Sequence, residues 1–172
     1  MKDNDLYYMQ IAKQVATRSK CHSRHVGAVL VQNDRIVATG FNGPPMGMRP
    51  CDRRWVEDGL YEKEQMFYDS VEHVAGQCPR RFLGYSSGTA LWLCPAAHAE
   101  RNALLSASLN GVSTKGSTLY AYCCRPCKDC MVEIVNAGVS RLVFLKSDKA
   151  YDELSWDIMK ECGLQYREVD ML

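Results

Sequence analysis

Two short motifs limit the folds that this chain can adopt. "HAE" holds His98, Ala99 and Glu100, "PCKDC" runs from Pro126 to Cys130, and His98 precedes Cys127 by 29 residues. Each motif stands at the predicted start of a helix, since "HAERNALLSASLNG" has helical spacing with a glycine stop and "CKDCMVEIVNAG" follows a predicted strand. If the two motifs form one site, the starts of these helices meet.

The rest of the chain alternates predicted strands and helices. A first helix follows Asp3 or Asp5 and ends near Ser19, and two β-branched runs then predict a hairpin. The strands are expected at "VGAVLV", "IVATGF", "STLYAYC", "RLVFL" and "LQYREV", with a further helix near 152–162. This alternation predicts one α/β domain over 1–172, with an insertion around 52–90 that is mostly helical between 55 and 75.

The motif side chains have the types and spacing of zinc ligands. Cys127 and Cys130 are three residues apart, so both sulfurs face one way on a helical turn, where helix-start amides favour thiolates. His98 completes three protein ligands, and the open fourth position is typical of a catalytic zinc. Nine cysteines without a secretion signal also favour metal binding or catalysis over disulfides.

Glu100 has the position of a general base. Two residues after a ligand, its carboxylate can lie beside the metal without binding it and take a proton from water that the metal activates. Each motif alone is less specific for a catalytic zinc site. "CKDC" also fits a redox pair or half of a zinc ribbon, and "HAE" also fits an ordinary helix start. A zinc-stabilised binding module, with Glu100 as a helix-start charge, is therefore the non-enzymatic alternative.

In combination, H-x-E and P-C-x-x-C resemble the signature of zinc-dependent nucleobase deaminases. The chain further resembles the deoxycytidylate (dCMP) deaminase family, with phage and bacterial members most similar, over nearly its full length except 55–88. The landmarks that carry this resemblance, in family order, are "SKC", "VGAVLV", "ATGFNGPP", "HAERNAL", "TLYAYCCRPCKDC", "NAGVSRLVF" and "SDKAYDE".

This resemblance implies a fold and an activity. The fold is the cytidine deaminase-like three-layer α/β/α sandwich with a central mixed sheet of about five strands. The activity is zinc-dependent hydrolysis of dCMP to dUMP and ammonia, which supplies dUMP for thymidylate synthesis. A deaminase of the same fold that acts on a base in tRNA or single-stranded DNA is the alternative. The nearly balanced charge of +1 argues against that alternative, because a polymer binder is expected to carry a basic stripe.

The resemblance also implies substrate contacts. Asn42 matches the family residue that contacts the sugar, and Ala99 and Tyr151 are further candidates. Arg125 is a candidate because it directly precedes the "PC" of the second motif, and Arg24 and His25 are basic residues before the first strand. The alternatives are a turn asparagine at 42, a helix-start tyrosine at 151 and solvated surface charges at the basic positions.

A second, structural zinc is implied for the cysteines outside the catalytic motif. Cys21, Cys51 and Cys94 match family positions, and either Cys78 or His73 completes a closed tetrahedral site. Four buried free thiols are the alternative.

Regulation and assembly follow from the same resemblance. It implies a homo-oligomer, with a hexamer favoured, that dCTP activates and dTTP inhibits, with a Mg²⁺-bound deoxynucleotide as possible effector. The absence of a long apolar run predicts a protein without membrane segments, located in the cytoplasm, or in the host cytoplasm if it is viral. No stable nucleic-acid partner is expected.

Overall fold

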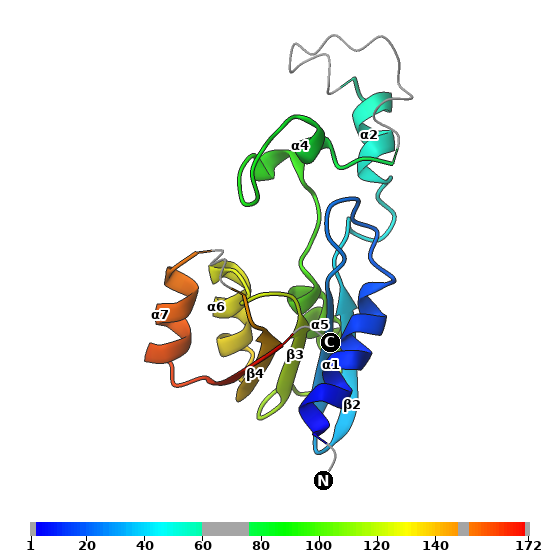
Figure 1. Ribbon diagram of the computed structural model, residues 1–172. Helices are drawn as coiled ribbons and strands as arrows, with labels where there is room; N and C mark the ends of the chain where they lie inside the picture. The colour runs from blue at the N-terminus through cyan, green and yellow to red at the C-terminus, as the bar shows by residue number, and fades with distance from the viewer. Residues whose placement is uncertain (1–2, 60–75, 148–151, 171–172) are drawn as a thin grey trace.

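The structure is a computed structural model that describes residues 3–59, 76–147 and 152–170, and a five-stranded sheet lies at its centre (Figure 1). The strand order is β2-β1-β3-β4-β5. The strands are β1 (Gly27–Gln32), β2 (Arg35–Phe41), β3 (Thr118–Tyr122), β4 (Arg141–Leu145) and β5 (Gln165–Val169). β1 runs antiparallel to β2 and β3, whereas β3, β4 and β5 are parallel, so the predicted mixed sheet is confirmed.

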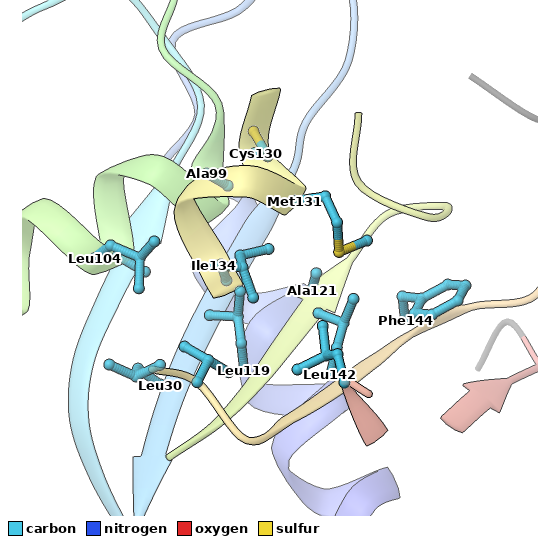
Figure 2. Close-up of a cluster of buried hydrophobic side chains, with 14 of the residues drawn as sticks. Leu30, Ala99, Leu104, Leu119, Ala121, Cys130, Met131, Ile134, Leu142 and Phe144 are labelled. Carbon is cyan, nitrogen blue, oxygen red and sulfur yellow. The ribbon is translucent and has the colours of Figure 1, made fainter. Parts of the chain in front are cut away.

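Helices cover both faces of this sheet. The four helices that pack on it are α1 (Asn4–Ala16), α5 (Ala99–Leu109), α6 (Lys128–Asn136) and α7 (Leu154–Glu161). One apolar cluster joins α1 to one face through Met9, Val29 and Val143. A larger cluster joins the other three helices to the opposite face, and Figure 2 shows its members Leu30, Leu119 and Leu142 beneath Ile134. The expected α/β/α sandwich is therefore confirmed.

The local predictions hold with small shifts at the ends of elements. The hairpin forms as predicted, and its turn residues Asn33 and Asp34 have φ values of 52° and 58°. Asparagine and aspartate tolerate this left-handed conformation better than most residues, which matches the twist of a two-residue hairpin turn. The first helix ends at Ala16, short of the expected Ser19.

Two glycines allow the helices to approach the sheet closely from opposite sides. A Cβ on Gly27 would lie 2.1 Å from the carbonyl oxygen of Ala12 in α1. A Cβ on Gly40 would lie 2.3 Å from both Ala99 O and Ala103 N in α5. Because real Cβ atoms do not approach backbone atoms so closely, only glycine fits at 27 and 40 without movement of a helix.

A buried carboxylate links the first helix to the far strands. Asp5 accepts two hydrogen bonds of 2.7 Å from Arg141 in β4, another of 2.7 Å from Arg167 in β5, and one of 3.0 Å from the Tyr120 hydroxyl. Hydrogen bonds from Arg141 above all hold the pKa of Asp5 well below its usual value, although burial opposes the shift. The carboxylate is thus charged and fully partnered.

Three short elements stand away from the sheet: α2 (Cys51–Glu57), α4 (Pro79–Phe82) and η2 (Leu91–Leu93) (Figure 1). α4 lies within the predicted insertion around 52–90, α2 begins one residue before it, and η2 follows directly after it. The helix expected over 55–75 is described only to residue 59, and α2 already begins at Cys51; the remainder of that prediction lies outside the described residues. The single-domain boundaries stay a prediction. None of the described helices is both long and apolar enough to cross a bilayer.

Candidate metal centre and active site

Three predicted ligands come together at the starts of two helices. His98 is the N-cap of α5, Cys127 is the N-cap of α6, and Cys130 lies in the first turn of α6. His98 Nδ1 lies 3.4 Å from Cys127 Sγ and 3.3 Å from Cys130 Sγ. Within the described ranges, this is the one group of three or more His, Cys, Asp or Glu ligand atoms that all lie within 4.8 Å of one another.

Backbone pairing and an ion pair hold the two helix starts in place. Gly43 and Ala97 exchange backbone hydrogen bonds of 3.2 and 3.0 Å, so the segment before His98 lies beside the end of β2. Arg101, in the first turn of α5, pairs with Glu133 of α6 through two contacts of 2.8 Å. Both of these side chains are partly exposed, so their pair orients the helices and adds little stability.

The sulfur pair has the electrostatics of a metal-binding site. A hydrogen bond from Cys130, followed by one with His98, lowers the pKa of the Cys127 thiol to about 4. The same hydrogen bond raises the pKa of Cys130, because the neighbouring thiolate opposes loss of the second proton. Hydrogen bonding to Cys127 raises the pKa of His98. A divalent cation would replace these shared protons, since it binds thiolates and neutral imidazole.

Glu100 lies beside the three ligands and is almost completely buried, with 3% of its surface exposed. Burial is the main reason that the pKa of Glu100 is raised. Its Oε1 lies 3.7 Å from Cys123 Sγ, whereas Oε2 has no hydrogen-bond partner among the residues that the structure describes. A buried carboxylate oxygen without a protein partner, next to an N, S, S donor set, fits a site for a zinc ion with its water.

The contact between Cys123 and Glu100 was not predicted. Cys123 is the last residue of the predicted strand "STLYAYC". Alternation along β3 contains the signal, because Leu119, Ala121 and Cys123 share one face and the first two lie in the cluster beneath α5 and α6. Extending this alternation by one step places the Cys123 side chain near the starts of α5 and α6.

The amide of Asn42 is used inside the protein. Its Oδ1 accepts hydrogen bonds from the Val26 amide at 2.9 Å and the Ser19 hydroxyl at 2.6 Å, and its Nδ2 donates to the Arg24 carbonyl at 2.8 Å. Asn42 therefore fixes the loop before β1 against the end of β2. Since an amide nitrogen carries two hydrogens, one donor can still face a substrate.

The other substrate candidates have different surroundings. Ala99 is fully buried in the core. Arg125 donates to Ser155 Oγ at 3.0 Å and to the Asp152 carbonyl at 2.9 Å, so its guanidinium is held by the start of α7. Arg24 is exposed and hydrogen-bonds Ser87, and its charge acts on the pKa of Cys123. Tyr151 lies outside the described residues.

The four cysteines of the suggested second site act on one another electrostatically. Burial first, and then the charges of Cys94, Cys21 and Cys78, raise the pKa of Cys51 to about 11. Cys21 Sγ also accepts the backbone amide of Ser23 at 3.4 Å. Among the described residues, however, no three of these four sulfurs all lie within 4.8 Å of one another. The alternative ligand His73 is outside the described residues.

The chain was compared with known protein families and sequences. It matches the family described as the cytidine and deoxycytidylate deaminase zinc-binding region over residues 2–146. It is 35% identical over 164 residues to a deoxycytidylate deaminase of Saccharomyces cerevisiae, and the match covers 95% of this chain but only 44% of the yeast protein. The deoxycytidylate deaminase of Enterobacteria phage T2 is 35% identical over 174 residues, with 95% of this chain and 91% of the phage protein covered.

Solved structures share the fold. The dCMP deaminase of cyanophage S-TIM5 in complex with dCMP and dUMP superimposes with a TM-score of 0.68 at 24% identity, covering 98% of this chain and 99% of that chain. Its apo form gives a TM-score of 0.64. The sheet order and the covering helices are therefore those of an established architecture.

Proposed function

The chain belongs to the family of zinc-binding cytidine and deoxycytidylate deaminases, and on that premise we propose that it hydrolyses dCMP to dUMP and ammonia. The observation that carries this proposal is the buried Glu100 carboxylate beside His98, Cys127 and Cys130. Support comes from relatives named deoxycytidylate deaminase, of which the phage T2 protein is matched over most of its length.

The four residues have separate tasks. His98, Cys127 and Cys130 would hold zinc, which would lower the pKa of a water molecule and so supply hydroxide near neutral pH. Glu100 takes the proton of that water on its free Oε2 and delivers it to the ring nitrogen of cytosine as the amino-bearing carbon is attacked. Glu100 then takes the remaining proton of the added hydroxyl group and passes it to the amine, so that the C–N bond breaks, ammonia departs and a carbonyl remains. A raised carboxyl pKa suits Glu100 for both accepting and returning a proton.

Substrate contacts are proposed on both sides of this centre. The second Nδ2 hydrogen of Asn42 faces the sugar hydroxyl, and Ala99 and Tyr151 contact the nucleotide as the family resemblance implies. For the phosphate, Arg24 is a better candidate than Arg125, because Arg24 is exposed while the guanidinium of Arg125 is held by Ser155 and Asp152. His25 is a second basic candidate.

A parallel assay tests the activity. Ammonia release is followed from cytosine, deoxycytidine, dCMP, dCTP and CMP, with Glu100→Gln as the inactive control. We expect dCMP to be preferred over deoxycytidine, because a phosphate dianion forms charge-assisted hydrogen bonds that a hydroxyl does not. Equal kcat/KM on the nucleoside contradicts the proposed substrate, and no turnover of any cytosine compound contradicts the activity. Mass spectrometry of tRNA and single-stranded DNA incubated with the protein tests the polymer alternative.

We also propose a structural zinc at Cys21, Cys51, Cys78 and Cys94. The electrostatic effect of the other three thiols on Cys51 supports it, as does the amide donated to Cys21. Metal analysis should find two zinc ions per chain in the wild type and one in Cys21→Ser and Cys51→Ser, with a lower Tm in both variants. One zinc throughout, with unchanged Tm, contradicts this second site. Zinc also requires reduced thiols, which supports a cytoplasmic location.

Assembly and regulation are proposed from the family. We expect a hexamer by sedimentation, activation by dCTP, inhibition by dTTP, and Mg²⁺ dependence of both effects. A monomer with unaltered kinetics at saturating dCTP and dTTP contradicts this part of the proposal.

A further inference from the structure

One carboxylate caps the starts of two helices. Asp152 Oδ2 accepts the backbone amide of Lys128, the first residue of α6, at 2.9 Å. Its Oδ1 accepts the amide of Ser155, the second residue of α7, at 2.7 Å. The first amides of a helix have no partner within the helix, so a side-chain acceptor stabilises each start. A bond to Ser155 is a local cap, whereas the bond to Lys128 joins residues 24 positions apart.

The loop before α6 also contacts the start of α7. Arg125 donates to Ser155 Oγ at 3.0 Å and to the Asp152 carbonyl at 2.9 Å, and its guanidinium carbon lies 5.1 Å from the centre of the Trp156 ring. Ser155 is fully buried, so this contact is shielded from water. The segment that contains the ligand Cys127 is therefore bound to α7 on both of its sides, through Arg125 before it and Lys128 after it. Figure 1 shows α6 and α7 side by side.

These contacts act on a ligand that helix geometry alone does not fix. Cys127 is the N-cap of α6: its carbonyl accepts the first helical hydrogen bond, from Met131 N at 2.9 Å, but its extended backbone angles of φ −66° and ψ 164° are not those of the helix. Cys130, within α6, has its position set by the helix and is buried in the core. A metal site requires each ligand atom to be held close to its bonding position, which outer hydrogen bonds achieve.

We propose that Asp152 is a positioning residue for the metal centre: by binding the Lys128 amide it fixes Cys127 at the distance from His98 and Cys130 that zinc requires. This role rests on the proposed function only in taking those three residues as the zinc ligands. Asp152 touches neither metal nor substrate in this proposal, and acts through the backbone of α6.

The test separates this role from ordinary helix capping. Asp152→Ser keeps one oxygen that can cap the Ser155 amide but loses the second acceptor for Lys128, and Asp152→Asn places an amide NH₂ against one of the two N–H groups. Asp129→Asn is the matched control, because Asp129 is an exposed carboxylate in the same first turn and, within the part of the chain that the structure describes, hydrogen-bonds only the Lys128 side chain. The measurements are zinc affinity by chelator competition, the absorption spectrum of the cobalt(II)-substituted protein, and Tm.

We expect zinc affinity to fall by about 10- to 100-fold in Asp152→Ser and Asp152→Asn, the usual effect of removing an outer hydrogen bond at a metal site. Their thiolate-to-cobalt absorption should shift, while Asp129→Asn behaves as the wild type. Affinity within twofold of the wild type in a folded Asp152 variant overturns the proposal, as does an equal loss in Asp129→Asn. If Asp152→Ser unfolds before titration, Asp152→Asn, which has nearly the same volume, decides the outcome.

These measurements do not depend on turnover. A wild-type protein that binds zinc but does not deaminate dCMP contradicts the proposed function and leaves the positioning role standing. Variants with unchanged affinity overturn the positioning role and leave the proposed function standing. A wild type that binds no zinc overturns both.

Discussion

Cys123 Sγ lies 3.7 Å from Oε1 of Glu100, whereas Oε2, the other oxygen of this carboxylate, is buried without a hydrogen-bond partner among the described residues. The two oxygens thus have different surroundings. The thiol holds the carboxylate in one orientation, and Oε2 is left for water and substrate. A buried carboxylate with one oxygen fixed and one available has the arrangement of a proton carrier.

Replacement of Glu100 by glutamine should separate chemistry from folding. Glu100→Gln has nearly the same shape and should retain zinc and Tm, but we expect kcat on dCMP to fall by more than about 100-fold, because general acid–base groups typically contribute about 10²- to 10⁴-fold. Steady-state kinetics and metal analysis on the same sample check this. Turnover close to that of the wild type would show that another group transfers the proton.

Loss of any catalytic ligand should reduce both zinc content and stability. In His98→Ala, Cys127→Ala and Cys130→Ala we expect less than one zinc at this site and a lower Tm, because metal affinity is coupled to folding. Cys162→Ala is the control, since Cys162 is exposed at the end of α7. Metal analysis with thermal unfolding gives the result. Wild-type zinc content in a ligand variant would contradict the assigned site.

Asn42 should affect both the loop and the substrate. Asn42→Ala removes the hydrogen bonds to Val26 and Arg24, so we expect a lower Tm and an increase of about tenfold in KM for dCMP, since a buried polar group without its partner costs about 1 to 3 kcal/mol. Ser19→Ala is the control: it removes the hydroxyl that donates to Asn42 and accepts the Cys21 amide, but leaves the bonds of Asn42 to Val26 and Arg24 in place. If the two variants lower Tm equally and neither changes KM, Asn42 has no role in binding.

Gly40 should be sensitive because of its contact with α5. In Gly40→Ala the new Cβ is too close to the backbone of Ala99 and Ala103. We expect the free energy of unfolding to fall by about 2 kcal/mol and Tm by roughly 4 to 8 °C. Zinc binding should also weaken. Gly27→Ala disturbs α1 on the opposite face of the sheet, so it should lower Tm without weakening zinc binding. Equal zinc affinity in the two variants would show that the start of α5 tolerates the displacement.

Stability at acid pH should depend on Asp5. Its folded-state pKa is depressed below the usual 3.8, chiefly by Arg141, so the unfolded chain binds more protons and the stabilisation is fully present only above that pH. We expect Asp5→Asn to cost about 2 kcal/mol at neutral pH, since hydrogen bonds to charged groups contribute about 1.5 to 3 kcal/mol. The difference from the wild type should shrink as pH falls below 3.8.

Denaturant unfolding at several pH values measures that difference. Glu168→Gln, on the exposed side of β5 next to Arg167, should show no comparable effect. A difference between Asp5→Asn and the wild type that stays constant down to pH 2 would contradict the ionic origin of the stabilisation.

Local patterns predicted most of the fold, because the hairpin, the strands and the helices each show their period within a few residues. The three metal ligands and Glu100 were also predictable, since their spacing relates directly to helix starts. The surroundings of Arg125 and Asp152 were not, because they depend on where α7 packs against α6. Sequence spacing also did not reveal that the amide of Asn42 binds the backbone of the loop before β1.

The ion cluster around Asp5 has a consequence for synthesis on the ribosome. Its two arginine partners lie 136 and 162 residues later in the chain. While the protein is being made, the first helix therefore has an uncompensated carboxylate and an apolar side that β1 and β3 cover only in part. Only when β4 and β5 have emerged do the arginines reach it. The nascent chain thus depends on being completed, and a chain whose translation stops before β5 should be a ready target for chaperones and proteases.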